Sequence, residues 1–187
     1  MANTKLEIIK VATQFVMKKG FNAMSYADIS KKLNVKNAAI HYHFPSKEDL
    51  GVAMMKQQQE NVAKLIKQLN EHQTTEEEQL LALVEIYVDL NRSGMICPIG
   101  SMGSDILTLP KKVQKEVIND YDQVIEWLTT ILENGRKKKK FRFDGNAKIK
   151  AFMIFNNLIS GVLVARFTKV VPFKESIDQM MAELQNK

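Results

Sequence analysis

This chain of 187 residues has few of the residues that build disulfide frameworks or metal sites, with one cysteine, Cys97, and three histidines. A single cysteine excludes an internal disulfide framework and favours a reducing compartment, so we expect a cytoplasmic protein. His41 and His43 are two residues apart and would project on different faces of a helix, with no further histidine or cysteine nearby. His72 stands alone in a polar stretch. We therefore expect no metal and no cofactor.

Sequence signals of enzymes and of membrane insertion are also scarce. The eight glycines form no phosphate-cradling loop, and no paired metal ligands occur, so we predict that the chain is not an enzyme. Its first residues, MANTKLEIIK, interleave polar side chains and do not resemble a signal peptide. The long apolar run at residues 151–167 falls short of the ~20 apolar residues that a membrane span needs. Four polar residues interrupt it: Asn156, Asn157, Ser160 and Arg166.

Helical periodicity runs through the rest of the chain, without a convincing strand or repeat. We predict an all-α fold of about nine helices, with a helix-turn-helix head and a helical ligand-binding and dimerisation body. The helices are predicted over residues 4–19, 25–33, 37–44, 46–69, from 74 or 75 to 92, 98–107, 110–138, 144–168 and from Pro172 onward. The run RKKKKFR, residues 136–142, is interpreted as a helix end and solvated loop, with weak DNA attraction as the alternative.

The stretch SYADISKKLNVKNAAIHYHFPSKEDL, residues 25–50, predicts two short helices joined by a tight turn. Ser25 and Asp28 have the spacing of a capping box, so a helix should begin there. Asn34 stands where a left-handed turn residue belongs, because Asn tolerates positive φ. A second helix, about Asn37–Phe44, follows after a short gap. This is helix-turn-helix geometry, which lays its second helix in the major groove of DNA.

The same segment resembles the amino-terminal domain of the tetracycline-repressor (TetR) family of bacterial regulators. The residues that carry the resemblance are Ser25, Ile29, Val35, Ile40-His41-Tyr42-His43-Phe44 and Ser46-Lys47-Glu48-Asp49-Leu50. Asn34, Ala38 and His41 depart from the family pattern, and of these only His41 lies where DNA would be touched. The resemblance implies a DNA-binding domain at residues 1–50, with its motif at 25–44, and a regulatory and dimerisation domain at 51–187.

Positive charge is concentrated in the same part of the chain. The formal net charge is +6, and residues 1–50 hold eight lysines against four acidic residues. The other 137 residues carry 19 basic and 17 acidic side chains, a balance of only +2. A phosphate-binding surface requires such a concentration, although lysine-rich surfaces are also common in soluble proteins.

We expect DNA contacts along the second helix of the motif and at the starts of two neighbouring helices. Asn37 can read adenine and the methyl of Ala39 can meet a thymine methyl. Ser25 and Lys47 are placed for phosphates by free N–H groups and charge. The predicted contacts are Ser25, Lys36, Asn37, Ala39, His41, Tyr42, His43 and Lys47; for Tyr42 and His43, packing is the alternative to phosphate contact.

The helix predicted around residues 151–167 is apolar nearly all round, which indicates burial on every side. In a domain this small, a second copy of the chain most easily covers one side. The last helix offers a matching apolar stripe, and Gly161 would allow a facing helix to approach closely. We therefore predict a homodimer with a four-helix interface and a near-palindromic operator, with a core helix of a monomer as the alternative.

The TetR resemblance implies a repressor released by a small-molecule inducer bound in the body. Candidate ligand residues are Tyr87, Met95, Met102, Trp127, Phe152, Phe155 and Asn156, for which ordinary core packing is the alternative. The pattern GMICPIGSMGSD at 94–105 resembles a segment of the subgroup that includes the electrophile-sensing N-ethylmaleimide repressor. Pro98 suits a first helical position, which would place Cys97 at an N-cap where N–H groups favour a thiolate; an inert packed cysteine is the alternative.

Together these patterns predict a ligand-responsive regulator that binds double-stranded operator DNA. They do not predict a membrane protein. The alternative is a helical small-molecule-binding protein without a DNA function. Salt-dependent binding to DNA separates the two, because only the first neutralises phosphates.

Overall fold

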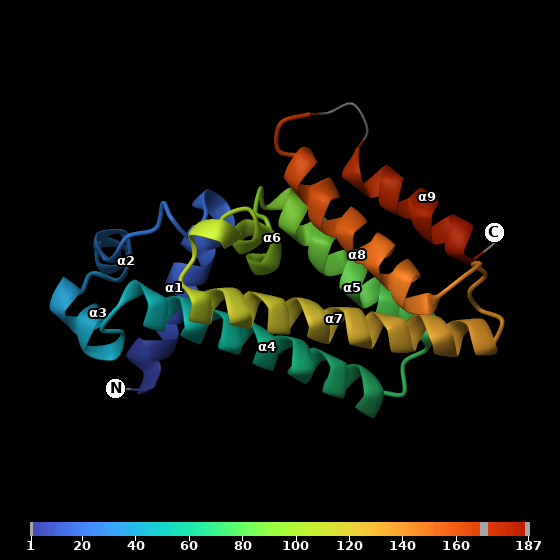
Figure 1. Ribbon diagram of the computed structural model, residues 1–187, viewed down its shortest axis with the longest axis horizontal. Coiled ribbons are helices and arrows are strands. Elements are labelled where there is room, and N and C mark those ends of the chain that lie inside the picture. The colour runs from blue at the N-terminus through green and yellow to red at the C-terminus, as the bar shows by residue number, and fades with distance from the viewer. Residues whose placement is uncertain (1, 169–171, 186–187) are drawn as a thin grey trace. The chain divides into compact units, whose positions relative to one another are not determined.

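The computed structural model describes residues 2–168 and 172–185, and the regular secondary structure of this part of the chain is all helical, as predicted (Figure 1). The elements are α1 Ala2–Lys19, α2 Tyr26–Leu33, α3 Asn37–His43, α4 Lys47–Glu71, α5 Glu76–Arg92, α6 Pro98–Gly103, the 3₁₀ helix η1 Ile106–Thr108, α7 Lys111–Lys137, α8 Ala147–Val164 and α9 Phe173–Gln185. Its described residues thus hold nine α-helices and no strand.

The chain divides into two compact units. The first contains the residues up to Asn61 together with Pro98–Tyr121, and the second contains Val62–Cys97 and the residues from Asp122 onward. Helices α4 and α7 each contribute to both units. The division predicted after residue 50 concerns function, falls inside α4, and stays a prediction.

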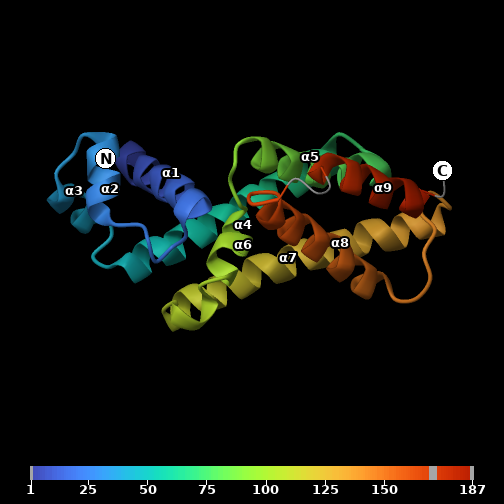
Figure 2. The same cartoon turned by 90° about the horizontal axis from the view of Figure 1, so that it is seen from above.

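The first unit is built around a three-helix head in which α1 and α3 both pack against α2 (Figure 2). Its apolar side chains are withdrawn from water, and Ile8, Ile29 and Ile40 are 0% exposed. Burying an aliphatic side chain of this size contributes roughly 1.5–3 kcal/mol. These side chains hold together α1 and two short helices, α2 and α3, that would be marginal alone.

Helix α6 packs on α1 within the same unit. The buried Ser101 hydroxyl donates a hydrogen bond to the carbonyl of Val16 at 2.5 Å. The backbone N–H of Asn22 donates to Asp105 at 3.2 Å, and its side-chain amide donates to Thr108 at 2.8 Å. The head is therefore fastened to α6 and η1, elements that come more than 75 residues later in the chain.

The second unit places α5, α8 and α9 against one another (Figure 2). Tyr87 of α5 and Phe155 of α8 are buried and meet edge to face, with ring centroids 6.0 Å apart. Gly161 was expected to admit a facing helix, and in this chain the ring of Phe173, the first residue of α9, lies against it. An ideal Cβ at Gly161 would come within 2.7 Å of that ring.

The starts of α5 and α8 can be compared with the capping residues that the local sequence suggests. The sequence left Thr74 and Thr75 open as the start of this helix, and the structure has Thr75 as the N-cap of α5, in a capping box with Glu78. Helix α8 begins later than expected, because Asn146 and not Asp144 is its N-cap: the Asn146 side chain accepts hydrogen bonds from the N–H groups of Lys148 and Ile149. The helix also ends at Val164, short of the predicted Thr168.

The lysine run at residues 136–142 ends a helix, as the plainer interpretation predicted. Helix α7 stops at Lys137, and the next lysine, Lys138, pairs with Glu76 at 2.7 Å. Arg136 donates to the carbonyl of Gly145 at 2.8 Å. These contacts fix part of the run within the second unit and offset the helix dipole.

Candidate nucleic-acid interface

The start and the end of α2 are fixed by its own sequence. Ser25 is extended, and its hydroxyl accepts from the N–H of Asp28 at 3.2 Å while the Asp28 carboxylate accepts from the N–H of Ser25 at 3.0 Å. The Ser25 hydroxyl also donates to that carboxylate at 2.7 Å, and this hydrogen bond, followed by the one from the Ser25 N–H, holds the pKa of Asp28 below its ordinary value. At the other end Asn34 adopts the left-handed conformation, with φ 54° and ψ 46°, as predicted. The turn into α3 is therefore sharp and local.

Helix α3 is anchored on one face and open on the other. Ile40 is 0% exposed and Phe44, at its C-cap, is 2% exposed, so both belong to the core. On the open face Tyr42 is 75% exposed, and Asn37 and His41 are exposed as well. A short helix that is anchored by apolar residues and presents polar and aromatic side chains outward has the form of a recognition helix.

Tyr26, which the sequence did not single out, fixes the exit from α3. Its hydroxyl lies 2.8 Å from the carbonyl of Phe44 and 2.6 Å from that of Ser46, so the proton can be donated to either oxygen. Its ring meets that of His41 with centroids 4.7 Å apart. Burial and then the charge of Asp49 raise the pKa of Tyr26 to about 12, which keeps the hydroxyl a donor. The only sequence signal for this role is an aromatic residue directly after the N-cap.

The start of α4 lies beside these residues. Ser46 and Asp49 exchange hydrogen bonds in the pattern of a capping box, with the Asp49 N–H donating to the Ser46 hydroxyl at 3.1 Å. Lys47, the first residue of the helix, reaches back so that its Nζ donates to the carbonyl of Asn22 at 3.1 Å and lies 4.8 Å from the centre of the Phe21 ring. Partial burial lowers the pKa of Lys47, against the opposing effect of Asp105.

The structure brings all the predicted DNA contacts into the first unit, around α3. Ser25, Lys36, Asn37, His41 and Tyr42 are exposed, whereas Ala39, His43 and Lys47 are half-buried. His43 also packs its ring edge-on against Tyr42, with centroids 5.2 Å apart. The assignment of all eight residues to DNA contact stays a prediction.

The predicted ligand residues do not gather in one place. Tyr87 and Phe155 pack on each other, Met102 is 0% exposed in the first unit, and Phe152 is 53% exposed on α8. Met95 lines a cavity of about 320 Å³ with Asn91, Gly94, Val162, Ala165 and Arg166, and Trp127 lines another of about 370 Å³. Asn156 is half-buried. The sequence could name candidate side chains, but not which cavity each one faces.

Cys97 immediately precedes Pro98, the first residue of α6, which agrees with the predicted N-cap position. Its side chain is only 5% exposed. A buried thiol must first be uncovered before it meets a dissolved electrophile.

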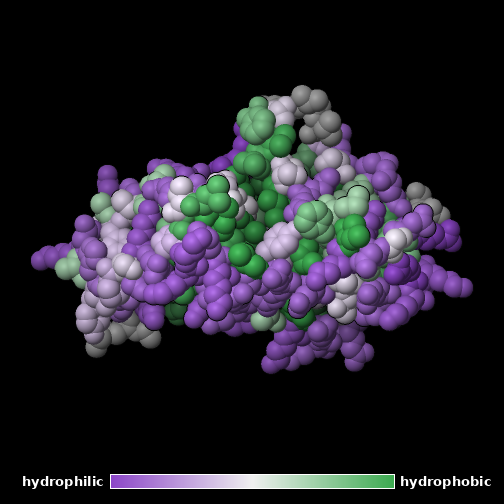
Figure 3. Space-filling model, in the orientation of Figure 1, coloured by the Kyte–Doolittle hydropathy of each residue, from purple (hydrophilic) through white to green (hydrophobic). Residues whose placement is uncertain are grey.

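One side of α8 carries an uncovered apolar surface. Ile154, Phe155 and Leu158 are buried within the chain, but large apolar side chains remain open to solvent at Ile149, Phe152, Met153, Leu163, Val164 and Phe167. Figure 3 shows hydrophobic side chains gathered over this helix. Among the described residues, α8 is also the one helix long and apolar enough to cross a membrane, with a mean hydropathy of 1.4. Contiguous apolar surface of this kind marks an interaction site.

Comparison with known proteins identifies relatives across nearly the whole chain. Residues 8–54, from α1 into α4, match the model of a family described as bacterial regulatory proteins, tetR family. The chain is 21% identical to the HTH-type transcriptional repressor NemR of Escherichia coli K12, over 98% of this chain and 93% of that protein.

Two solved structures are similar in fold and sequence. A TetR-family regulator from Agrobacterium tumefaciens superposes with a TM-score of 0.90 at 26% identity, covering 98% of both chains. A TetR transcriptional regulator from Legionella pneumophila gives a TM-score of 0.86 at 30% identity, covering 98% of this chain and 97% of that one. The family match falls on the helix-turn-helix, and the structural likeness extends through both units.

Proposed function

Because the chain belongs to the TetR family of bacterial transcriptional regulators, we propose that it is a cytoplasmic repressor that binds a near-palindromic operator as a homodimer and leaves it when an inducer binds. The observation that carries the proposal is the open face of α3, whose inner side is anchored by Ile40 and Phe44. A rigid helix of this kind can enter the major groove without rearranging the head.

Within this proposal the DNA-contacting residues form two groups: those that face the bases and those that bind the phosphate backbone. Asn37, Ala39 and Tyr42 face base edges or the adjoining backbone, and His41 adds a contact particular to this chain. Ser25, Lys36 and Lys47 bind phosphates at the margins, where they set the register and carry no sequence information.

The dimer is proposed from the uncovered side of α8. Phe152 and Met153 are 53% and 58% exposed, and a soluble monomer rarely leaves such a row of apolar side chains in water. Two copies of α8 and α9 would bury the row in a four-helix interface. A two-fold dimer presents two α3 helices, so the operator needs two half-sites related by the same symmetry.

The switch is proposed to act through α4. This helix begins at Lys47 beside α3 and continues through residue 71, so its residues contribute to both units. An inducer that binds better when α4 is tilted shifts the population towards heads that no longer match the half-site spacing. The inducer need not touch the head.

Two classes of inducer are consistent with this mechanism. A small molecule can bind in a cavity of the second unit, or an electrophile can modify Cys97, which the position of this residue before α6 favours. Replacing Cys97 by Ser separates the classes. A variant that still releases operator DNA on treatment with a quinone would exclude the thiol as the sensor.

The experiment that tests the proposed function is a selection of bound sequences from random duplex DNA with the purified protein. We expect a near-palindromic sequence whose enrichment falls steeply with salt, because phosphate contacts release counterions. Repeating the selection with small molecules and oxidants identifies the signal. A helical binding protein without a DNA function would enrich no sequence.

A further inference from the structure

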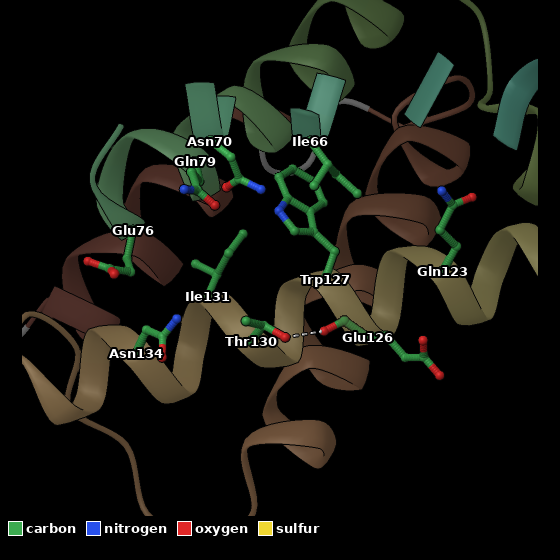
Figure 4. Close-up of a pocket in the computed structure, with 10 residues that line it drawn as sticks. All are labelled: Ile66, Asn70, Glu76, Gln79, Gln123, Glu126, Trp127, Thr130, Ile131 and Asn134. Carbon is green, nitrogen blue, oxygen red and sulfur yellow. Dashed lines mark hydrogen bonds between the residues drawn. The ribbon is translucent and has the colours of Figure 1, made fainter. Parts of the chain in front are cut away.

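A polar cavity of about 370 Å³ lies in the second unit where the end of α4, the start of α5 and the second half of α7 meet (Figure 4). It is lined by Ile66, Asn70, Glu76, Gln79, Gln123, Glu126, Trp127, Thr130, Ile131 and Asn134. Its size is within the range of small-molecule sites. Four of the ten lining side chains are carboxamides, an unusual share for a surface that only packs helices together.

Trp127 contributes a hydrogen-bond donor without an acceptor. Its side chain is 8% exposed, and its buried Nε1 atom has no hydrogen-bond partner among the described residues. In Figure 4 the indole nitrogen faces the space bounded by Asn70, Gln79 and Ile131. Buried indole N–H groups nearly always find a partner, because leaving one unpaired costs about 1–3 kcal/mol. The cavity therefore lacks an acceptor at a defined position.

The charges around the cavity select against ions. Two lining residues are charged, both acidic: Glu76 is paired with Lys138 at 2.7 Å, and Glu126 is exposed to solvent. No lysine or arginine lines the space, so an anion would find no cationic partner in the lining. A cation would find one carboxylate already neutralised and the other hydrated. The other polar groups that line the cavity, which are side-chain amides, the Thr130 hydroxyl and the Trp127 N–H, are uncharged.

We propose that this cavity binds an uncharged small molecule with a carbonyl or hydroxyl oxygen that accepts the Trp127 N–H bond. The side-chain amides of Asn70 and Asn134 then pair with its remaining hydroxyl or amide groups, and Ile66 and Ile131 cover its apolar part. This proposal rests on the proposed function in one respect only, namely that the bound molecule acts as the inducer. Binding itself does not depend on DNA.

The chain has one tryptophan, so a two-dimensional NMR spectrum of the nitrogen-labelled protein contains one indole N–H signal. We would titrate it with three molecules of nearly equal shape and different charge: nicotinamide, nicotinate and 1-methylnicotinamide. Nicotinamide should shift the signal saturably, and the anion and the cation should bind at least ten times more weakly. No shift with nicotinamide, or equal affinity for a charged analogue, would overturn the proposal.

Variants test the named contacts. Asn70→Ala should weaken nicotinamide binding at least fivefold, whereas Asn119→Ala, an exposed change on the same helix as Trp127, should leave it unchanged. In Trp127→Phe, saturation-transfer NMR should show a similar loss although the aromatic ring is kept. Equal loss in Asn119→Ala, or full binding by Trp127→Phe, would contradict the assignment. Operator binding without nicotinamide is measured separately, so failure of the DNA function and failure of this site give different results.

Discussion

At the scale of single residues, the orientation of α3 depends on side chains that the helix-turn-helix pattern does not include. Tyr26 bridges the first helix of the motif to the chain between α3 and α4 through the carbonyls of Phe44 and Ser46. Ser25, Asp28 and Asn34 could be assigned from sequence because their partners lie within a few residues. The role of Tyr26 could not, because its partners are 18 and 20 residues away and meet it only in the folded head.

Replacing Tyr26 by Phe removes the hydroxyl and leaves the ring in place. We expect the free energy of unfolding to fall by about 1–2 kcal/mol, since a hydrogen bond contributes about 1 kcal/mol net and two carbonyls lose their donor. Operator affinity should fall as well, because the exit of α3 is no longer fixed. Urea denaturation and fluorescence anisotropy measure the two effects. The matched change Tyr42→Phe, on an exposed tyrosine, should leave stability unaltered.

Lys47 has both a structural and a proposed DNA-binding role. Its ammonium group contacts the Asn22 carbonyl and the Phe21 ring, and we propose that it also binds phosphate. Lys47→Ala should therefore weaken binding to all DNA sequences alike and lower the slope of log affinity against log salt by about one. Titrations at several salt concentrations check this. A variant with reduced stability but an unchanged slope would limit Lys47 to the structural role.

At the scale of elements, the helices themselves were predictable because their apolar periodicity and caps are local signals. The start of α8 was misplaced because Asp144 and Asn146 are both good capping residues, and the choice depends on which side chain reaches the free N–H groups. The contact between Phe173 and Gly161 could not be predicted from the sequence. A glycine in an apolar helix indicates that another element approaches closely, but it does not identify that element.

Helix α7 contains a buried acid that should make stability depend on pH. Asp120 shares the buried stripe of Val113, Val117 and Val124, is 0% exposed, and neither of its carboxylate oxygens has a hydrogen-bond partner among the described residues. Burial raises the pKa of Asp120 from 3.8 to about 7. The folded protein therefore keeps a proton that the unfolded chain has already released at intermediate pH.

Between pH 4 and 7 the unfolded state binds fewer protons at this site, so stability should fall as the pH rises and level off above about 7. At about 1.4 kcal/mol per pKa unit, Asp120 accounts for at most roughly 4 kcal/mol of this change. Urea unfolding at pH 5.5 and pH 8 measures about half of this change, roughly 2 kcal/mol, and Asp120→Asn should reduce the difference. An equal difference in the variant would show that Asp120 is not the cause.

At the scale of the whole molecule, the proposed binding to a near-palindromic operator requires two copies of the chain. The sequence predicted the dimer from a helix that is apolar all round, and the structure shows which side of α8 its own chain leaves uncovered. The sequence could not choose between a core helix and an interface helix, because both have the same composition. Whether α8 is a core helix or an interface helix depends on how much of its surface the other helices of the same chain cover.

Phe152→Glu places a charge in the middle of the proposed interface. We expect a monomer at micromolar concentration and an operator affinity at least tenfold lower, because an unpaired charge is costly to bury and a single head makes half the contacts. Sedimentation velocity and anisotropy check the two effects. Leu107→Glu is the control, since Leu107 is 94% exposed in the first unit. A Phe152→Glu protein that remains dimeric would exclude this face as the interface.

The proposed placement of α3 of each copy in a major groove of the operator can be measured by a hydroxyl-radical footprint on the selected DNA. We predict two protected segments whose centres lie about one helical turn, or a whole number of turns, apart, both lost in Tyr42→Ala. A single protected segment, even protection along the duplex, or an unchanged footprint in the variant would contradict it.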